Sequence, residues 1–343
     1  MKVAVFSTKS YDSEFLDAAN AAAQANHDFV YFDTRLSPKT ASLAADFPAV
    51  CVFVNDDVGA ETLEILAEQG TRFIALRSTG FNHVDLKTAA ELGIKVARVT
   101  VYSPFSVAEH AVGLVLMLNR RLYRAYNRVR DDNFSLEGLL GFDLHDSTVG
   151  VIGTGKIGII FAQIMQGFGC YLLGYDAFPN PKFEEINNAR YVQLPELFAN
   201  ADIISLHCPL TPETYHLIDA NAIAQMKPGM MLINTSRGGL IDTKAVIEGI
   251  KSGKIGNLGI DVYEQEDELF FRDLSDTVIL DDDFQLLQSF PNVVITAHQA
   301  FFTRNALSDI SNTTVANITE VEQGHPLKNE ISYQLSVSIA TSG

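Results

Sequence analysis

A histidine closes a short apolar strand near the end of the chain, where His298 follows NVVITA and precedes QAFF. Three more residues follow other apolar strands: Arg237 in NTSRGG, and Asp261 and Glu266 in DVYEQED. A carboxylate beside an imidazole favours the protonated ring, which can donate a proton to a carbonyl oxygen. A guanidinium can hold a carboxylate through paired hydrogen bonds. These residue types therefore suit proton transfer to a carbonyl compound that carries a carboxylate.

Each of these residues also has a plain structural interpretation. His298 could be a hydrogen-bonded histidine at a strand end, and Arg237 could pair with a carboxylate of another domain. Asp261 could cap a turn, and Glu266 could be solvated, as most glutamates are. The position of these residues in the sheet favours a catalytic or binding role over a structural one, because ligands of an open parallel sheet bind beyond the carboxyl ends of its strands. Four polar clusters follow such ends, at residues 207–211, 234–239, 261–267 and 297–302.

A glycine-rich turn lies in GTGKIG, where Gly153, Gly155 and Gly158 have the G-x-G-x-x-G spacing. It follows an apolar strand, opens a helical segment, and is followed by Asp176 at the end of the next strand. In this context the pattern indicates a dinucleotide site with the pyrophosphate at the helix N-terminus. Asp176 would accept hydrogen bonds from the adenosine ribose and repel a 2′-phosphate. The sequence therefore favours NAD over NADP.

Apolar strands alternate with helical segments along the chain. In the first hundred residues we expect strands at 2–7, 29–33, 49–54, 72–78 and 95–99, and helices at 12–26, 40–46, 60–69 and 85–92. Later we expect strands at 147–153, 171–176, 191–194, 202–207, 229–236, 258–263 and 292–297, and helices at 156–168, 214–226 and 242–252. Apolar strands separated by helices are typical of parallel sheets covered on both faces. The sequence therefore predicts an α/β protein with two doubly wound parallel-sheet domains.

A long helical segment at 105–130 links the two series of strands, and a last helix at 303–323 has no strand after it. We expect this last helix to return to the first domain. The predicted domains are accordingly a discontinuous one, 1–100 plus 300–343, and a continuous one, 101–299. From Ser332 onward, the polar sequence predicts a frayed tail.

Composition and charge argue against several classes of partner. The 343 residues carry a net charge of −17, which would repel a phosphate backbone, so we expect no nucleic-acid partner. The apolar run at 111–118 is far shorter than the roughly 20 residues of a membrane span, so we expect no membrane association. The first residues have one lysine and an apolar stretch too short for a signal peptide, so we expect no secretion. Cys51, Cys170 and Cys208 form no CxxC pair, which favours reduced thiols in the cytoplasm and no metal site.

A basic cluster follows the apolar helix, in NRRLYRAYNRVR at 119–130. Four of its five arginines have helical spacing, namely Arg120, Arg121, Arg124 and Arg128. We interpret this segment as a solvated or subunit-contacting face rather than an anion site. Together with the apolar helix before it, the segment predicts a homodimer or homotetramer.

Motifs along nearly the whole chain resemble the NAD-dependent D-2-hydroxyacid dehydrogenases, and within them the fermentative D-lactate dehydrogenases. The motifs that carry the resemblance are RSTGFNHVDL, YSPFSVAEHAVGL, NFSLEGLLGFDL, VIGTGKIG, SLHCPLTPETYHLI, NTSRGGLID, LGIDVYE and HQAFFT. The resemblance implies a Rossmann NAD-binding domain inserted into a flavodoxin-like substrate domain, with the active site in the cleft between them. It also implies oxidoreductase activity on a 2-keto or 2-hydroxy acid.

The resemblance also implies a role for individual residues. His298 is similar to the general acid and base of the family, Glu266 to its carboxylate partner, and Arg237 to the clamp for the substrate carboxylate. The implied cofactor contacts are Gly153, Gly155, Lys156, Ile157, Gly158, Asp176, Cys208, Pro209, Thr214, Thr235, Ser236 and Asp261, the last toward the nicotinamide carboxamide. The implied substrate contacts are Ser78, Thr79, Gly80, Tyr102 and Arg237, and Phe301 is a further candidate from its place after His298. Lys156 and Thr214 depart from the residues that several relatives carry.

The size of the substrate is predicted from the two phenylalanines after His298. Large rings beside the histidine would narrow the pocket and favour a small substrate, although Phe301 and Phe302 could equally pack in the core. We therefore expect NADH-dependent, reversible reduction of pyruvate to D-lactate. A larger branched or aromatic 2-keto acid is the alternative substrate. A further alternative is an NADH-sensing corepressor on the same scaffold.

Overall fold

The computed structural model describes residues 1–333 and divides the chain into two compact units. The first unit comprises Met1–Ser103 and the chain from Phe302 onward, and the second comprises Pro104–Phe301. The sequence-based division follows residues 100 and 299 instead. Of the tail predicted from Ser332 onward, the part after residue 333 lies outside the described residues.

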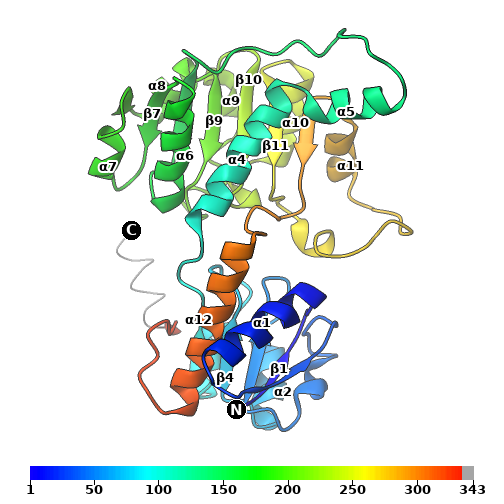
Figure 1. Cartoon of the computed structure of the whole chain (residues 1–343), viewed down its shortest axis with the longest axis vertical. Coiled ribbons are helices and arrows are strands. Elements are labelled where there is room, and N and C mark those ends of the chain that lie inside the picture. Colours follow the sequence, from blue (N-terminus) through cyan, green and yellow to red (C-terminus); the bar gives the residue numbers. More distant parts are fainter. Residues whose placement is uncertain (334–343) are drawn as a thin grey trace. The chain divides into compact units, whose positions relative to one another are not determined.

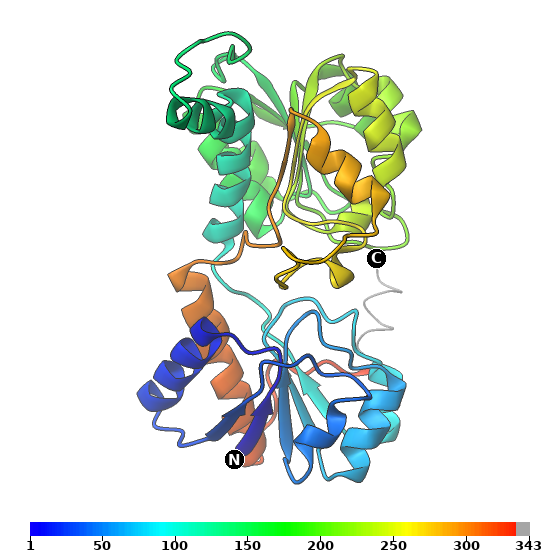
Figure 2. The same cartoon turned by 90° about the vertical axis from the view of Figure 1, so that its right-hand side faces the viewer.

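The first unit is built on a five-stranded parallel sheet (Figure 1). Its strand order is β2-β1-β3-β4-β5, and the strands are β1 (Lys2–Val5), β2 (Asp28–Tyr31), β3 (Ala49–Val52), β4 (Phe73–Leu76) and β5 (Lys95–Ala97). The helical segments are α1 (Ser10–Ala22), η1 (Ala41–Ala44), α2 (Ala60–Glu68), α3 (Leu86–Glu91) and α12 (Arg304–Glu322). Figure 2 shows α1 and α12 on one face of this sheet and α2 and α3 on the other.

Helix α12 belongs to the first unit although it follows the second unit in sequence. Its side chains Val315 and Ile318 are buried in one core with Val3, Leu16 and Phe73. The helix packs against α1 and β4. The structure thus places the last helix on the first sheet, where the sequence analysis expected it.

The second unit is built on a seven-stranded parallel sheet with the order β12-β11-β10-β9-β6-β7-β8. The strands are β6 (Thr148–Ile152), β7 (Tyr171–Tyr175), β8 (Ala189–Tyr191), β9 (Ile203–Leu206), β10 (Met230–Asn234), β11 (Ile255–Ile260) and β12 (Val293–Ile295). The α-helices are α4 (Pro104–Asn119), α5 (Leu122–Arg130), α6 (Lys156–Gly167), α7 (Pro181–Glu184), α8 (Leu194–Asn200), α9 (Ala220–Gln225), α10 (Thr243–Lys251) and α11 (Asp282–Ser289). Two short 3₁₀ turns are η2 (Gly238–Leu240) and η3 (Glu266–Glu268).

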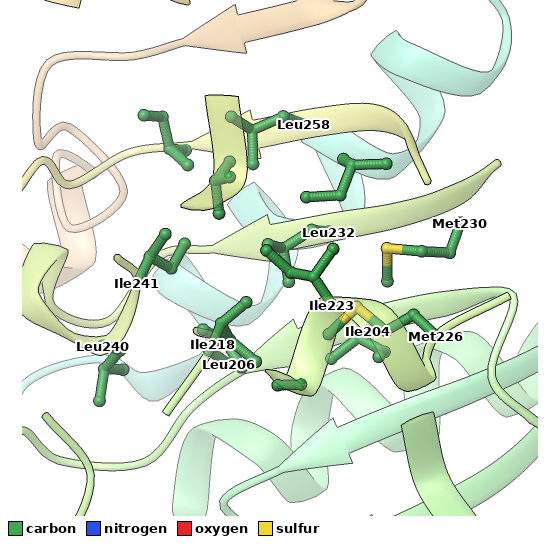
Figure 3. Close-up of a cluster of buried hydrophobic side chains, with 14 of the residues drawn as sticks. Ile204, Leu206, Ile218, Ile223, Met226, Met230, Leu232, Leu240, Ile241 and Leu258 are labelled. Atoms are coloured by element: carbon green, nitrogen blue, oxygen red, sulfur yellow. The ribbon is translucent and has the colours of Figure 1, made fainter. Parts of the chain in front are cut away.

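Apolar side chains cover both faces of this second sheet. One face carries Leu206, Leu232 and Leu258 under the helices α8 to α11, and Figure 3 shows part of this cluster. The other face packs against α4 and α6. Two parallel sheets, each covered on both faces, confirm the predicted α/β class.

Some predicted elements differ from the observed ones. The helix expected at 214–226 covers only Ala220–Gln225, because the Asp219 side chain accepts a hydrogen bond from Ala222 N and starts the helix there. The helix expected at 105–130 is interrupted at Arg121, whose φ of 52° is left-handed. The strand expected at 191–194 is Ala189–Tyr191. Helices α7, α8 and α11 were not predicted.

Candidate active site

The four polar clusters expected at one edge follow four neighbouring strands of the second sheet. The strands β9, β10, β11 and β12 are adjacent and parallel. Their carboxyl ends therefore lie at one edge, where the loops after them meet. This edge carries residues 207–211, 234–239, 261–267 and 297–302.

His298 and Glu266 form a direct pair at this edge. The Nδ1 atom of His298 lies 2.8 Å from Oε1 of Glu266, and the two side chains are 21% and 20% exposed. The other carboxylate oxygen accepts a hydrogen bond from Tyr263 N at 2.9 Å. With Glu266 ionised, the imidazole presents its proton at Nδ1 to the carboxylate, so Nε2 is the nitrogen available for a substrate.

Asp261 holds the backbone around His298. Its carboxylate is fully buried and accepts hydrogen bonds from Gln299 N at 2.9 Å and Ala300 N at 2.8 Å. Its carbonyl oxygen accepts a 2.7 Å bond from His298 N. His298 itself has a left-handed φ of 51°, which an L-residue other than glycine adopts at a cost. The structure therefore gives Asp261 the turn-capping role, and its predicted contact with the nicotinamide remains a prediction.

Two aromatic rings lie beside the imidazole of His298. The ring of Phe301 is 6.4 Å away, edge to face, and that of Phe271 is 5.7 Å away with an interplanar angle of 41°. Phe301 is only 8% exposed. The ring of Phe302 instead contacts Tyr11 within the first unit, at 4.7 Å. The sequence analysis missed Phe271, although a second pair of phenylalanines, four and five residues after Glu266, was a usable signal.

His110 is a second residue that the sequence analysis missed. Its Nε2 atom lies 3.0 Å from Thr296 Oγ1 and 3.5 Å from Asp261 Oδ1. Thr296 Oγ1 in turn donates to Asp261 Oδ1 at 2.5 Å. Helix α4 thus contributes one side chain to the network that holds the His298 turn.

Arg237 lies in a turn that Asn234 folds. The Asn234 side chain is fully buried, donates to Arg237 O at 2.8 Å and accepts from Ser236 N at 3.0 Å. Ser236 Oγ donates to Cys208 O at 2.6 Å and ties the turn to the next loop. The guanidinium of Arg237 is half-buried and bonds Ser236 O through Nη1 at 2.7 Å. These contacts fix the base of the arginine side chain at the strand edge.

The glycine-rich turn has the shape that a dinucleotide site needs. A Cβ atom on Gly153, whose φ is 94°, would lie 2.4 Å from Cys208 N, and one on Gly158 would lie 1.9 Å from Gly153 O. Gly155 begins α6 as its N-cap, and a Cβ atom there would meet nothing within 4 Å. Packing therefore requires glycine at 153 and 158. The side of Gly155 is left open, beside the first free N–H groups of the helix.

Other predicted cofactor residues surround this turn. Asp176 is half-buried, and its carboxylate accepts from Thr154 N at 2.6 Å and Phe178 N at 2.9 Å. Thr235 Oγ1 is buried and has no hydrogen-bond partner among the described residues. An unpartnered buried hydroxyl, a carboxylate at the end of β7 and the open face of Gly155 together fit a dinucleotide. Lys156 and Ile157 form the first turn of α6.

The loop after β9 carries three more predicted cofactor residues. Burial raises the pKa of the Cys208 thiol to about 11, so this cysteine is a neutral thiol at neutral pH. Thr214 Oγ1 donates to Pro209 O at 2.7 Å and accepts from Thr211 N at 2.8 Å. The Thr214 hydroxyl therefore holds its own turn. Burial also lowers the pKa of the adjacent His207 to about 3, which excludes it as a proton donor at neutral pH.

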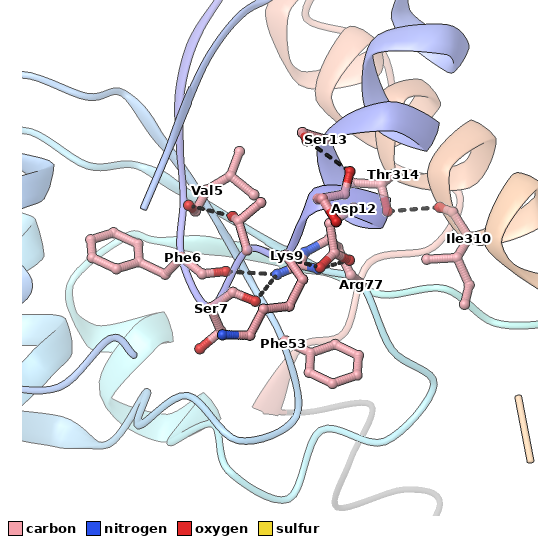
Figure 4. Close-up of polar contacts among 12 residues, drawn as sticks. Val5, Phe6, Ser7, Lys9, Asp12, Ser13, Phe53, Arg77, Ile310 and Thr314 are labelled. Carbon is pink, nitrogen blue, oxygen red and sulfur yellow. Dashed lines mark hydrogen bonds and ion pairs between the residues drawn. The ribbon is translucent and has the colours of Figure 1, made fainter. Parts of the chain in front are cut away.

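The predicted substrate residues Ser78, Thr79, Gly80 and Tyr102 lie in the first unit. Ser78 is 5% exposed, and its hydroxyl donates to Gly80 O at 2.7 Å. Arg98 Nη1 donates to Thr79 O at 2.9 Å. Immediately before this loop, Figure 4 shows Arg77 between the carbonyl oxygens of Phe6 and Ser7 and the carboxylate of Asp12. Tyr102 is half-buried.

Three further properties concern the residues that the structure describes. Cys51, Cys170 and Cys208 are all buried and free of disulfides. Among residues 1–333, no cluster of histidine, cysteine and carboxylate side chains could hold a metal ion. In the same range, no helix has both the length and the hydropathy to span a bilayer.

Comparisons with known proteins identify the class. Residues 112–300 match the model of the D-isomer specific 2-hydroxyacid dehydrogenase, NAD binding domain. The chain is 52% identical to D-lactate dehydrogenase of Escherichia coli, over 96% of this chain and 100% of that protein. It is also 52% identical to a 2-hydroxyacid dehydrogenase homolog of Haemophilus influenzae, over 96% and 98%. A solved structure of the pyruvate reductase of Chlamydomonas reinhardtii has a TM-score of 0.91 at 44% identity, covering 96% and 98%.

The chain belongs to the D-isomer specific 2-hydroxyacid dehydrogenases. Its second unit contains the NAD-binding domain of that family, with the glycine-rich turn, Asp176 and Thr235 inside the matched segment. NAD is accordingly the cofactor of this protein.

Proposed function

We propose that this protein is an NAD-dependent D-lactate dehydrogenase, which reduces pyruvate to D-lactate and catalyses the reverse reaction. The observation that carries the proposal is the 52% identity to D-lactate dehydrogenase of Escherichia coli across the whole of that enzyme. The pair of His298 and Glu266 at the carboxyl edge of the sheet supports it independently, because 2-keto acid reduction needs a proton donor there.

His298 is the proton donor in this proposal. NADH, when bound, supplies the hydride for the carbonyl carbon. The protonated imidazole gives its Nε2 proton to the carbonyl oxygen, while Glu266 holds Nδ1 and stabilises the positive charge of the ring. In the direction of lactate oxidation, the neutral imidazole accepts the hydroxyl proton. Asp261 supports both directions because it holds the backbone that carries the imidazole.

Arg237 binds the substrate carboxylate through its guanidinium, which suits a planar, paired contact. The backbone amides of residues 78–80 contribute further hydrogen bonds to the carboxylate, and Tyr102 contributes its ring. Charge on the substrate thus selects 2-keto acids over simple ketones. Positioning the carboxylate also fixes the carbonyl relative to His298.

The cofactor contacts follow from the loops of the second unit. The N–H groups at the start of α6 and the face of Gly155 receive the pyrophosphate. Asp176 accepts hydrogen bonds from the adenosine ribose, and the buried Thr235 hydroxyl gains a partner. The remaining proposed contacts come from the loops after β9 and β10, and are Cys208, Pro209, Thr214 and Ser236.

Phe301 limits the size of the substrate in this proposal. Its ring lies edge to face with His298 and is almost fully buried. A buried ring beside the proton donor leaves more room for a methyl group than for a benzyl group. Pyruvate therefore fits better than branched or aromatic 2-keto acids.

The protein assembles as a homodimer or homotetramer through α5 and the chain after it. Large apolar side chains in this segment are exposed to solvent in the single chain, namely Leu122, Tyr126, Val129, Phe134, Leu136 and Leu140. Exposed apolar patches of this kind are typical of subunit contacts. We assign the basic cluster to the same surface, with the exception of Arg128. The Arg128 guanidinium donates hydrogen bonds to Ser135 O and Glu137 O and holds the loop that contains them. The three free thiols favour a cytoplasmic location.

An assay of NADH consumption across a panel of 2-keto acids tests the function. We expect the highest kcat/KM with pyruvate and D-lactate as the product on chiral analysis. A higher kcat/KM with phenylpyruvate or a branched 2-keto acid would show that the larger acid, and not pyruvate, is the substrate. Failure to oxidise NADH with any 2-keto acid would contradict the proposal and favour a corepressor that only senses NADH.

A further inference from the structure

The turn that carries Arg237 rests directly on the segment after β11. A Cβ atom on Gly238 would lie 2.1 Å from Tyr263 C and 2.4 Å from Glu264 N. Only glycine permits this approach, so the backbone beside Arg237 lies against the Tyr263–Glu264 peptide. The position of Arg237 therefore depends on where residues 263 and 264 lie.

A second segment holds the other side of the same turn. His216 N donates to Gly239 O at 2.8 Å, Ile218 N donates to Leu240 O at 3.0 Å, and Asp242 N donates to Ile218 O at 3.1 Å. Ile218 and Ile241 also form a parallel bridge. Figure 3 shows Ile218, Leu240 and Ile241 together in the buried cluster beneath the turn. Backbone pairing and burial thus attach the turn to residues 216–218.

The carboxylate of Glu264 links the two supporting segments. Its Oε1 atom lies 2.6 Å from His216 Nε2 and accepts from Tyr215 OH at 3.3 Å. Its Oε2 atom accepts from Thr243 Oγ1 at 3.0 Å, at the start of α10 and just past the turn. Glu264 and His216 are 23% and 28% exposed. One carboxylate therefore holds the chain before, under and after the Arg237 turn.

Local strain at His216 points to a requirement for this link. His216 has a left-handed φ of 52°, and its ring stacks on Tyr215 at 3.9 Å with an interplanar angle of 18°. A non-glycine residue keeps such a backbone only where its surroundings hold it. The contact with Glu264 is 48 residues distant in sequence, so it comes from the tertiary fold and not from the local turn.

We propose that Glu264 and His216 are positioning residues for Arg237. The inference rests on the proposed function, in which Arg237 binds the substrate carboxylate. Two glutamates of one short segment then have different roles. Glu266 orients His298, the proton donor, and Glu264 positions Arg237, which binds the substrate carboxylate. The contact between Glu264 and His216 is not needed for the core, because backbone pairing and the burial of Ile218 already attach residues 216–218.

Two variants of Glu264 separate positioning from folding. Glu264→Ala removes every contact of the carboxylate, and we expect kcat/KM for pyruvate to fall between about 10-fold and 100-fold, mainly through a higher KM. Glu264→Gln keeps an acceptor for Thr243, so we expect it to recover most of that loss. In both variants the KM for pyruvate should rise more than the KM for NADH, because the proposed pyrophosphate and ribose contacts, Gly155 and Asp176, come from other loops.

A double-mutant cycle with Arg237→Lys tests whether Glu264 acts through the arginine. We expect the combined variant to lose no more activity than Arg237→Lys alone. Losses that multiply, or a KM for pyruvate unchanged in Glu264→Ala, would overturn the proposal. If Glu264→Ala does not fold, His216→Ala enters the same cycle, because it leaves the contact between Glu264 and Thr243 in place.

Lys227→Gln is the matched control. This substitution breaks the ion pair between Lys227 and Asp202, in which both side chains are 39% exposed. The pair lies at the opposite end of the same sheet. We expect wild-type KM values from it. The wild-type assay stands apart from this test: absence of activity with all 2-keto acids refutes the proposed function, whereas an active enzyme with a multiplicative cycle refutes only the positioning role.

Discussion

The Nδ1 atom of His298 lies 2.8 Å from the carboxylate of Glu266, and the two residues come from loops that follow neighbouring strands. This contact fixes which ring nitrogen is left for a substrate. It also separates His298 from His207, whose pKa is lowered to about 3 by burial. Of these two histidines at the edge of the sheet, His298 is the one paired with a carboxylate, whereas the ring of His207 contacts the Ser205 hydroxyl.

Replacing His298 by alanine should collapse turnover. We expect kcat for pyruvate reduction to fall by about 10²–10⁴, because the carbonyl oxygen loses its proton donor. The affinity for NADH, measured by fluorescence titration, should stay within a few-fold of wild type. A turnover number close to that of the wild type would show that another group donates the proton.

Glu266→Gln should change the pH dependence more than the folding. A neutral amide does not stabilise a positively charged imidazole, so reduction should fail at a lower pH than in the wild type. Oxidation of D-lactate, which needs the neutral ring, should persist to lower pH. Profiles of kcat/KM against pH, for pyruvate reduction and for D-lactate oxidation, measure both effects. Identical profiles for the wild type and Glu266→Gln would contradict the pairing of His298 with Glu266.

Asp176→Ala should weaken the preference for NADH. The loss of a charged acceptor for the ribose costs about 1.5–3 kcal/mol, or roughly 10-fold to 100-fold in kcat/KM for NADH. Activity with NADPH should rise or stay level, because the repulsion of a 2′-phosphate is removed. Asp176→Asn is the control, since it keeps an acceptor for Thr154 N. Equal use of both cofactors by the unmutated protein would refute the assignment.

Phe301→Ala should widen the pocket. We expect the ratio of kcat/KM for phenylpyruvate to that for pyruvate to rise by about tenfold or more, because a larger side chain then fits beside His298. Phe302→Ala is the matched control: its ring is 47% exposed and packs on Tyr11. If both variants shift the ratio equally, Phe301 does not select the substrate.

Acid should destabilise the protein through its buried neutral histidines. Burial lowers the pKa of His207 to about 3, whereas an unfolded histidine binds its proton near pH 6.5. Between these values the unfolded state binds more protons, so the free energy of unfolding falls as the pH drops, by up to about 1.4 kcal/mol per pH unit. Urea unfolding between pH 7.5 and 5 should show a shallower decline for His207→Gln. His145→Gln, with a side chain 73% exposed, should match the wild type.

The sequence was sufficient for the two sheets because their strands are almost continuously apolar. Phe73–Leu76 and Met230–Asn234 are entirely buried, and such runs between helical segments have few other interpretations. The interruption at Arg121 had no signal, because a left-handed arginine looks like any other arginine in a basic helix. The short helices α7 and α8 were missed because few apolar positions define them.

The candidate site was predicted less evenly than the fold. His298 and Glu266 are 32 residues apart in sequence, and the rule that ligands bind beyond the carboxyl ends of parallel strands predicted both at one edge. The contact between His216 and Glu264 spans 48 residues and joins two loops, so no spacing rule could reveal it. Phe271 was missed although its phenylalanine pair was a usable signal, because the sequence does not show that the loop brings this ring to the imidazole.

The return of α12 to the first sheet has a consequence for how the chain folds as it is made. Val315 and Ile318 complete a core that also contains Val3 and Phe73, so the first hundred residues lack part of their packing until the last helix leaves the ribosome. The second unit ends at Phe301 and has its full set of strands before that moment. Translation therefore favours completion of the second unit first. Until α12 is made, one face of the first sheet lacks part of its cover and exposes apolar surface that chaperones can bind.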